Sequence, residues 1–140
     1  MKNSEIVKIC KEVSSRKNAR FEFVYKIYFL ENILLNISQS KYSENFILKG
    51  GVYLSNIFGL NTRTTSDADF HVWKLPLKEQ NMKKVLLKAL SKEKELSYSI
   101  YKMTEIKKND IYKGIRALVK CWTDDNVSEI SKIDRLPEIL

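Results

Sequence analysis

The stretch from Phe46 to Val72 constrains the fold of this chain more tightly than any other. It begins with a short apolar, β-compatible segment, and Lys49-Gly50-Gly51 follows directly. Glycine has no Cβ, so the backbone there can turn sharply and approach a ligand closely. The pattern predicts, in order, a strand over 46–48, a double-glycine turn, a short helix over 52–58, a polar loop over 61–66 and a second strand over 67–73.

The second predicted strand carries two acidic residues in alternation with apolar ones. Side chains two apart in a strand point the same way, so Asp67 and Asp69 share a face, about 6–7 Å apart. Two such carboxylates repel each other unless a cation lies between them. A pair of Mg²⁺ ions would remove the repulsion and create a phosphoryl-transfer site. The alternative is a solvated polar face, because Asp-x-Asp by itself does not distinguish the two. His71 falls on the same face, as a substrate contact or as a structural hydrogen-bonding residue.

The double-glycine turn predicts a place for phosphate. The N–H groups at the start of a helix have no intrahelical acceptors and attract anions. Lys49 and Arg63 would add positive charge there, Arg63 as a bidentate fork. The Gly-Lys-Ser/Thr ending of a P-loop is absent, so a tight turn without any ligand is the alternative.

The remaining chain predicts an α+β fold with a small mixed sheet. Apolar residues at helical spacing predict helices over 3–16, 19–38 and 78–95. Strands are expected over 96–105, 111–123 and 127–134, with a turn at Asp124-Asp125-Asn126. We expect one domain over 1–140, with N-terminal helices in 1–40 and the sheet core in 46–134.

Charge and cysteine content narrow the class of protein. The formal net charge of +8 favours phosphate-bearing partners, or else reflects a lysine-rich solvated surface. The same alternatives apply to the basic helix over 78–95, which would guide an RNA backbone or simply face solvent. Cys10 and Cys121 have no partners at metal-ligand spacing, which argues against structural zinc and favours free thiols. Without a signal peptide or a long apolar run, a cytoplasmic protein with no membrane association is expected.

The order and spacing of these motifs resemble the AbiEii/AbiGii toxin family of the DNA polymerase β-like nucleotidyltransferase superfamily. The segments that carry the resemblance are Leu48-Lys49-Gly50-Gly51, Leu54, Arg63-Thr64-Thr65 and Asp67-Ala68-Asp69-Phe70. A looser likeness extends to Tyr112-Lys113-Gly114-Ile115-Arg116, which resembles the strand that usually follows. The resemblance implies a nucleotidyltransferase-like fold.

The resemblance also implies roles for individual residues. Gly50 and Gly51 would cradle the nucleotide phosphates, and Asp67 and Asp69 would hold the catalytic metals. The residues expected on the phosphate-binding side are Lys49, Arg63, Thr64 and Thr65. Val52 stands where the family often has a small hydroxyl residue. Asp134 is the best candidate for the third carboxylate on a neighbouring strand, although an ordinary surface acid is the alternative.

The resemblance finally implies an activity. It is transfer of a nucleotide from an NTP, with Mg²⁺, to a hydroxyl of an RNA such as tRNA or of a protein. The expected setting is a toxin–antitoxin or abortive-infection phage-defence system with a cognate antitoxin. The sequence ends six residues after Asp134, where relatives continue into a helical region. The alternative is therefore a truncated, catalytically inactive module that binds nucleotide, RNA or a partner.

Overall fold

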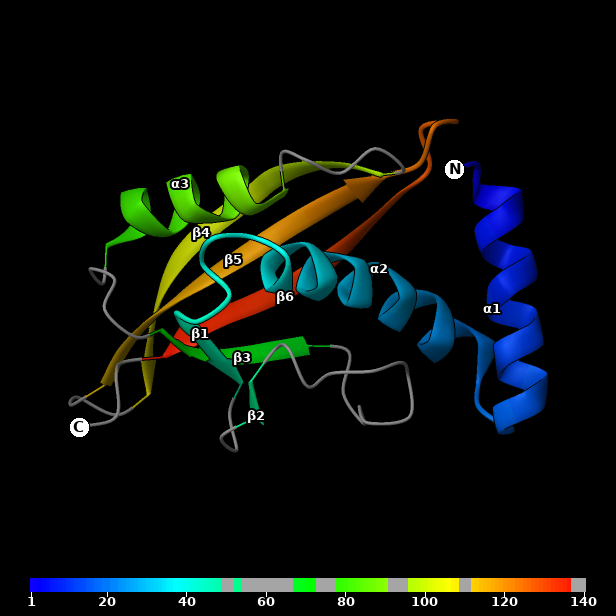
Figure 1. Cartoon of the computed structure of the whole chain (residues 1–140), viewed down its shortest axis with the longest axis horizontal. Helices are drawn as coiled ribbons and strands as arrows, with labels where there is room; N and C mark the ends of the chain where they lie inside the picture. The colour runs from blue at the N-terminus through cyan, green and yellow to red at the C-terminus, as the bar shows by residue number, and fades with distance from the viewer. Residues whose placement is uncertain (49–51, 54–66, 73–77, 91–95, 109–111, 137–140) are drawn as a thin grey trace.

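The computed structural model describes residues 1–48, 52–53, 67–72, 78–90, 96–108 and 112–136. Within these, three helices and six strands follow each other along the chain (Figure 1). They are α1 (Asn3–Lys17), α2 (Phe21–Ser38), β1 (Phe46–Leu48), β2 (Val52–Tyr53), β3 (Asp67–Val72), α3 (Glu79–Leu90), β4 (Ser97–Lys108), β5 (Tyr112–Trp122) and β6 (Ser128–Leu136).

The six strands form one mixed sheet in the order β2-β1-β3-β6-β5-β4. The long strands β4, β5 and β6 make an antiparallel meander. β1 pairs antiparallel with both β2 and β3. The one parallel pairing among the described strands joins β3 to β6 at the middle of the sheet. The α+β fold with N-terminal helices before a small mixed sheet is thus confirmed.

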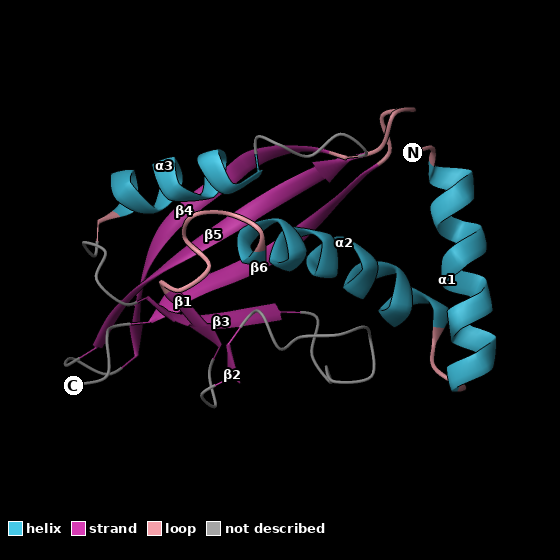
Figure 2. Ribbon diagram, in the orientation of Figure 1, coloured by secondary structure: helices cyan, strands magenta, loops and turns pink. Residues whose placement is uncertain are grey.

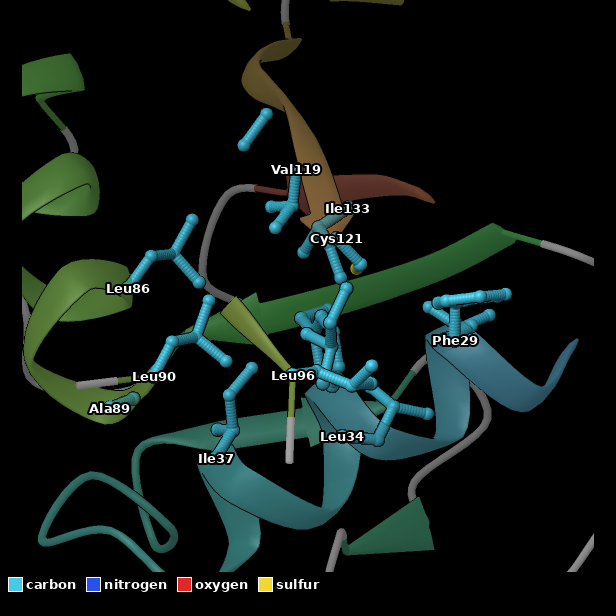
Figure 3. Packing of buried hydrophobic residues seen from close by; sticks show 14 of the residues in the cluster. Phe29, Leu34, Ile37, Leu86, Ala89, Leu90, Leu96, Val119, Cys121 and Ile133 are labelled. Atoms are coloured by element: carbon cyan, nitrogen blue, oxygen red, sulfur yellow. The ribbon is translucent and has the colours of Figure 1, made fainter. Parts of the chain in front are cut away.

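Helices α2 and α3 cover one face of this sheet (Figure 2). Ile37 of α2 and Leu86 of α3 point toward Val119 and Ile133, which lie on the strands beneath them (Figure 3). Helix α2 presents buried side chains along most of its length because its apolar residues recur at helical spacing. We call the sheet face covered by α2 and α3 the inner face and the opposite one the outer face.

Helix α1 is held at its first turn by distant residues. Its N-cap residue Lys2 makes no side-chain capping bond. The carboxylate of Asp125, in the turn between β5 and β6, instead accepts a 2.9 Å hydrogen bond from the backbone N–H of Asn3. The N-terminal amino group makes a 2.6 Å ion pair with Asp124 in the same turn. A hairpin turn therefore satisfies one of the N–H groups that a helix start leaves unpaired.

The predicted helix over 52–58 is wrong at its first two residues. Val52 and Tyr53 form β2, and Leu48 pairs with Val52 in an antiparallel register. β-branched and aromatic side chains fit a strand surface, and β1 offers an edge for pairing. Residues 54–58 lie outside the described part of the chain, as do 91–95 at the end of the predicted third helix.

The other predicted helices and strands are confirmed within the described residues, and so are the free thiols. The double-glycine turn and the polar loop over 61–66 lie outside the described residues. The turn at 124–126 is present, with Asn126 in the left-handed region at φ 62°. Cys10 and Cys121 are both free and buried. Burial raises the pKa of the Cys10 thiol to about 11 and that of Cys121 to about 12. Neither thiol ionises near neutral pH, so both behave as core side chains rather than as nucleophiles.

No helix in the described ranges combines the length and the apolar character that crossing a membrane requires.

Candidate active site

The parallel pairing of β3 with β6 brings two acidic residues to the same level of the sheet. Asp69 and Asp134 are register partners, although 65 positions separate them in sequence. Paired residues on neighbouring strands lie about 5 Å apart across the sheet and point to the same face. Asp69 is partly exposed and Asp134 is buried.

Both carboxylates belong to the outer face. Phe70, next to Asp69, is fully buried on the inner face. The centroid of its ring lies 5.3 Å from that of Phe46, in an edge-to-face arrangement. Ile133, next to Asp134, is buried among the residues under the helices. Because side chains alternate along a strand, Asp69 and Asp134 point away from α2 and α3. His71 follows the same alternation and is partly exposed on the outer face.

Arg116 of β5 binds Asp134 through a two-pronged ion pair. Its Nε donates to Oδ1 at 2.9 Å and a terminal guanidinium nitrogen donates to Oδ2 at 3.1 Å. The two residues are register partners in the β5–β6 hairpin, so the strand pairing itself aligns the fork with the carboxylate. The pair compensates the burial of the Asp134 charge, which would otherwise cost several kcal/mol.

Sequence reasoning missed this role of Arg116, although a signal was present. The hairpin is symmetric about Asp125, since Trp122 pairs with Ser128 and Arg116 with Asp134. Counting outward from the predicted 124–126 turn therefore places Arg116 directly opposite Asp134. Within the sequence, Arg116 stood out only as part of a loose family motif.

The described part of the chain contains the acidic residues of the predicted site. Asp69 and Asp134 are placed as above, and Asp67 begins β3 as the register partner of Lys132. The predicted phosphate-binding residues Lys49, Gly50, Gly51, Arg63, Thr64 and Thr65 lie outside the described residues. Their roles stay predictions.

The carboxylate chemistry of the site suits Mg²⁺, with one condition. Aspartates such as Asp67 and Asp69 are the hard oxygen ligands that Mg²⁺ prefers. Both oxygens of Asp134, however, are engaged by Arg116. Among the described residues no group of three or more His, Cys, Asp or Glu side chains is placed to hold a metal ion. Asp134 would join such a site through the lone pairs that these two hydrogen bonds leave.

The mixed sheet, the helices on one face and the paired acidic strands define a nucleotidyltransferase-like α+β fold. A sequence profile described as nucleotidyl transferase AbiEii toxin, type IV toxin–antitoxin system, matches residues 32–136, three quarters of the chain. The chain belongs to this AbiEii family of nucleotidyltransferase-like toxins. The match runs from within α2 to the end of β6, so it covers every strand of the sheet. A search of curated proteins gives no significant match.

Proposed function

We propose that this chain is a Mg²⁺-dependent nucleotidyltransferase that moves a nucleotide from an NTP to a hydroxyl group of RNA or protein. Its setting would be a type IV toxin–antitoxin system that acts in phage defence and is restrained by a cognate antitoxin. One observation carries the proposal. Asp69 and Asp134, far apart in sequence, are register partners on adjacent parallel strands of a chain from the AbiEii family.

The reaction requires one bond to form and one to break at the α-phosphorus of the NTP. The acceptor oxygen bonds to phosphorus, the bond to the β-phosphate oxygen breaks, and pyrophosphate leaves with the electron pair. Bound Mg²⁺ would lower the pKa of the acceptor hydroxyl and neutralise charge on the phosphates. Asp67 and Asp69 would hold the metal. Asp134 would orient the acceptor hydroxyl or take its proton on a lone pair that the Arg116 hydrogen bonds leave.

The proposal is tested by label transfer. Purified protein is incubated with Mg²⁺, each α-labelled NTP in turn, and either tRNA, total RNA or cell lysate. We expect label on one acceptor class and a loss of at least about a hundredfold in Asp69→Asn, since a metal ligand is removed. Asp124→Asn, the same change in the hairpin turn, should transfer label like the unmodified protein. Equal transfer by Asp69→Asn would contradict the proposal.

The ion pair favours a second candidate function, a non-catalytic binding module. Arg116 hydrogen-bonds both oxygens of Asp134 and balances its charge, which makes that carboxylate a weaker metal ligand and base. Calorimetric titration with NTP and Mg²⁺ separates the two candidates. Nucleotide binding that survives Asp69→Asn, together with no label transfer to any acceptor, would establish the module.

A further inference from the structure

The outer face of β4, β5 and β6 carries aromatic and basic side chains and has no described helix or strand packed on it. Strand register assigns residues to this face, because register partners share a face and alternate residues repeat it. The partly or fully exposed ones, besides serines, are Tyr101, Lys102, Thr104, Ile106, Arg116, Leu118, Lys120, Trp122, Ile130 and Lys132. Two of these side chains, Tyr101 and Trp122, are large aromatic rings.

Three of these side chains form a cluster that strand geometry holds in place. The Lys120 ammonium lies 4.4 Å from the centroid of the Trp122 ring and 5.7 Å from that of Tyr101. The Trp122 indole N–H donates a 3.4 Å hydrogen bond to Ser99, which fixes the ring orientation. We call Tyr101, Lys120 and Trp122 the outer-face cluster.

A bulge in β4 places the Tyr101 side chain in this cluster. The register of β4 against β5 shifts between Ile100 and Lys102, so Tyr101 is the extra residue. Bulges redirect a side chain without breaking the sheet, and here the bulge places Tyr101 beside Lys120. Tyr101 is 59% exposed, more than any other large hydrophobic side chain in the described ranges. Ile130 is the register partner of Lys120, and its apolar side chain is 37% exposed on the same face.

The charge of this face selects the kind of partner. Among the side chains of β4–β6 that the structure describes, its cations are Lys102, Lys120, Lys132 and Arg116. The acid on this face of the same strands is Asp134, whose charge Arg116 neutralises. The excess is positive, as in the whole chain with its net charge of +8. A lysine between an exposed tyrosine ring and a partly exposed tryptophan ring matches a strand of nucleic acid, in which phosphates alternate with flat bases.

We infer that the outer face of β4–β6 binds single-stranded nucleic acid, with the Tyr101 and Trp122 rings stacking on bases and Lys120 contacting the backbone. A duplex buries the faces of its bases, so exposed rings favour a single strand. Trp122 lies six positions after Arg116 along β5, about 20 Å at the rise of a strand. Arg116 holds Asp134, the register partner of Asp69. A strand that is docked on the cluster and follows β5 would therefore reach the carboxylates.

The inference rests on the proposed function only in its last step, the delivery of a strand end to the carboxylates. Binding itself requires neither NTP nor metal. Fluorescence anisotropy with EDTA present measures it alone, using a labelled single-stranded RNA of about twelve nucleotides, DNA of the same sequence, and the corresponding duplex. Tighter binding of the RNA would identify contacts to the 2′-hydroxyl, and equal binding would identify a general single-strand site.

Substitutions in the outer-face cluster test the assignment. Tyr101→Ala should weaken single-strand binding about tenfold, and Tyr101→Phe should retain it, because stacking needs the ring. Lys120→Gln should weaken binding at least about fivefold and reduce the slope of log K against log salt by about 0.7. Lys84→Gln, on the exposed side of α3, removes the same charge and should change affinity less than about twofold. Circular dichroism confirms that each variant is folded.

The inference is overturned if Tyr101→Ala and Lys120→Gln lose no more affinity than Lys84→Gln, or if the duplex binds as tightly as the single strand. Asp69→Asn separates this inference from the proposed function. If Asp69→Asn binds RNA normally while no variant transfers label, the surface stands and the proposed enzyme falls. If label transfer occurs on RNA and is insensitive to Tyr101→Ala, the enzyme stands and the delivery of a strand from the outer face to the carboxylates is overturned.

Discussion

Arg116 and Asp134 form the ion pair on which the candidate site depends. Their burial is unequal, since the Arg116 side chain is 34% exposed and the Asp134 side chain 4% exposed. The guanidinium keeps some contact with water, whereas the carboxylate depends on Arg116 for both of its oxygens. Removal of the arginine would leave the Asp134 carboxylate buried without a partner for its charge. Removal of both residues would leave no buried charge.

We expect Arg116→Met to lower the free energy of unfolding by about 2–3 kcal/mol. This is below the roughly 3–5 kcal/mol for a fully buried pair, because the guanidinium is one-third exposed. The double variant Arg116→Met/Asp134→Leu should recover most of the loss, since no charge is then buried alone. Urea denaturation of the four proteins in the cycle measures the effect. Lys120→Met, on the same face of β5, should cost under about 1 kcal/mol. A double variant as unstable as Arg116→Met would contradict the account.

At the scale of elements, the hairpin turn between β5 and β6 acts on helix α1. Asp125 accepts hydrogen bonds from the Asn3 N–H at 2.9 Å and from the Thr123 hydroxyl at 2.6 Å. These bonds hold the pKa of Asp125 below its usual value, with the Thr123 bond as the larger cause. A negative charge at a helix N-terminus is favourable as well. The helix start and the turn therefore support each other across 122 positions of sequence.

Asp125→Ala should destabilise the protein at pH 7, and the difference from the unmodified protein should become smaller in acid. The folded pKa of Asp125 lies below the unfolded value, so its contribution is present above about pH 4 and is lost as pH falls further. Asp125→Asn keeps an oxygen acceptor, so at pH 7 its free energy of unfolding should lie between those of Asp125→Ala and the unmodified protein. Urea denaturation from pH 7 to pH 3 checks this. A difference that stays constant down to pH 3 would show that the carboxylate charge has no part in the contact.

At the scale of the whole molecule, the two faces of the sheet differ in what they carry: one packs the core and the other carries the polar side chains. The inner face packs against α2 and α3 and forms the core (Figure 3). The outer face carries Asp69, Arg116 and Asp134 and the outer-face cluster. Helices on one side of a sheet supply enough apolar burial for folding, which leaves the other side available for polar chemistry. Metal binding at the outer face should then stabilise the whole fold.

Mg²⁺ should raise the melting temperature by about 3–6 °C at a concentration about ten times the Kd. Binding to the native state alone contributes about 1.4 kcal/mol under that condition. Differential scanning fluorimetry at constant ionic strength measures the shift, with NaCl as the salt control. Asp69→Asn should abolish the shift and Asp124→Asn should preserve it. An undiminished shift in Asp69→Asn would place the metal elsewhere.

Local pattern determined most of the secondary structure. The helical spacing in 3–16 and 19–38 and the alternation in 67–73 correspond to α1, α2 and β3, because solvent exposure on one side imposes the period of each element. The turn at 124–126 followed from its Asp and Asn residues. The alternation alone also puts Asp69 and His71 on one face of a strand, since a period of two requires no knowledge of the neighbouring strands.

Tertiary structure decided the rest. Val52 and Tyr53 became a strand because the edge of β1 was there to pair with, a fact that no local window contains. Asp69 meets Asp134 only because β3 and β6 pair in parallel across 65 positions. Arg116 reaches Asp134 because the hairpin register aligns them. The chain by itself specified which residues share a face of each element, since periodicity is local. Which faces and strands adjoin depends on burial over the whole sheet, and only the folded structure settled it.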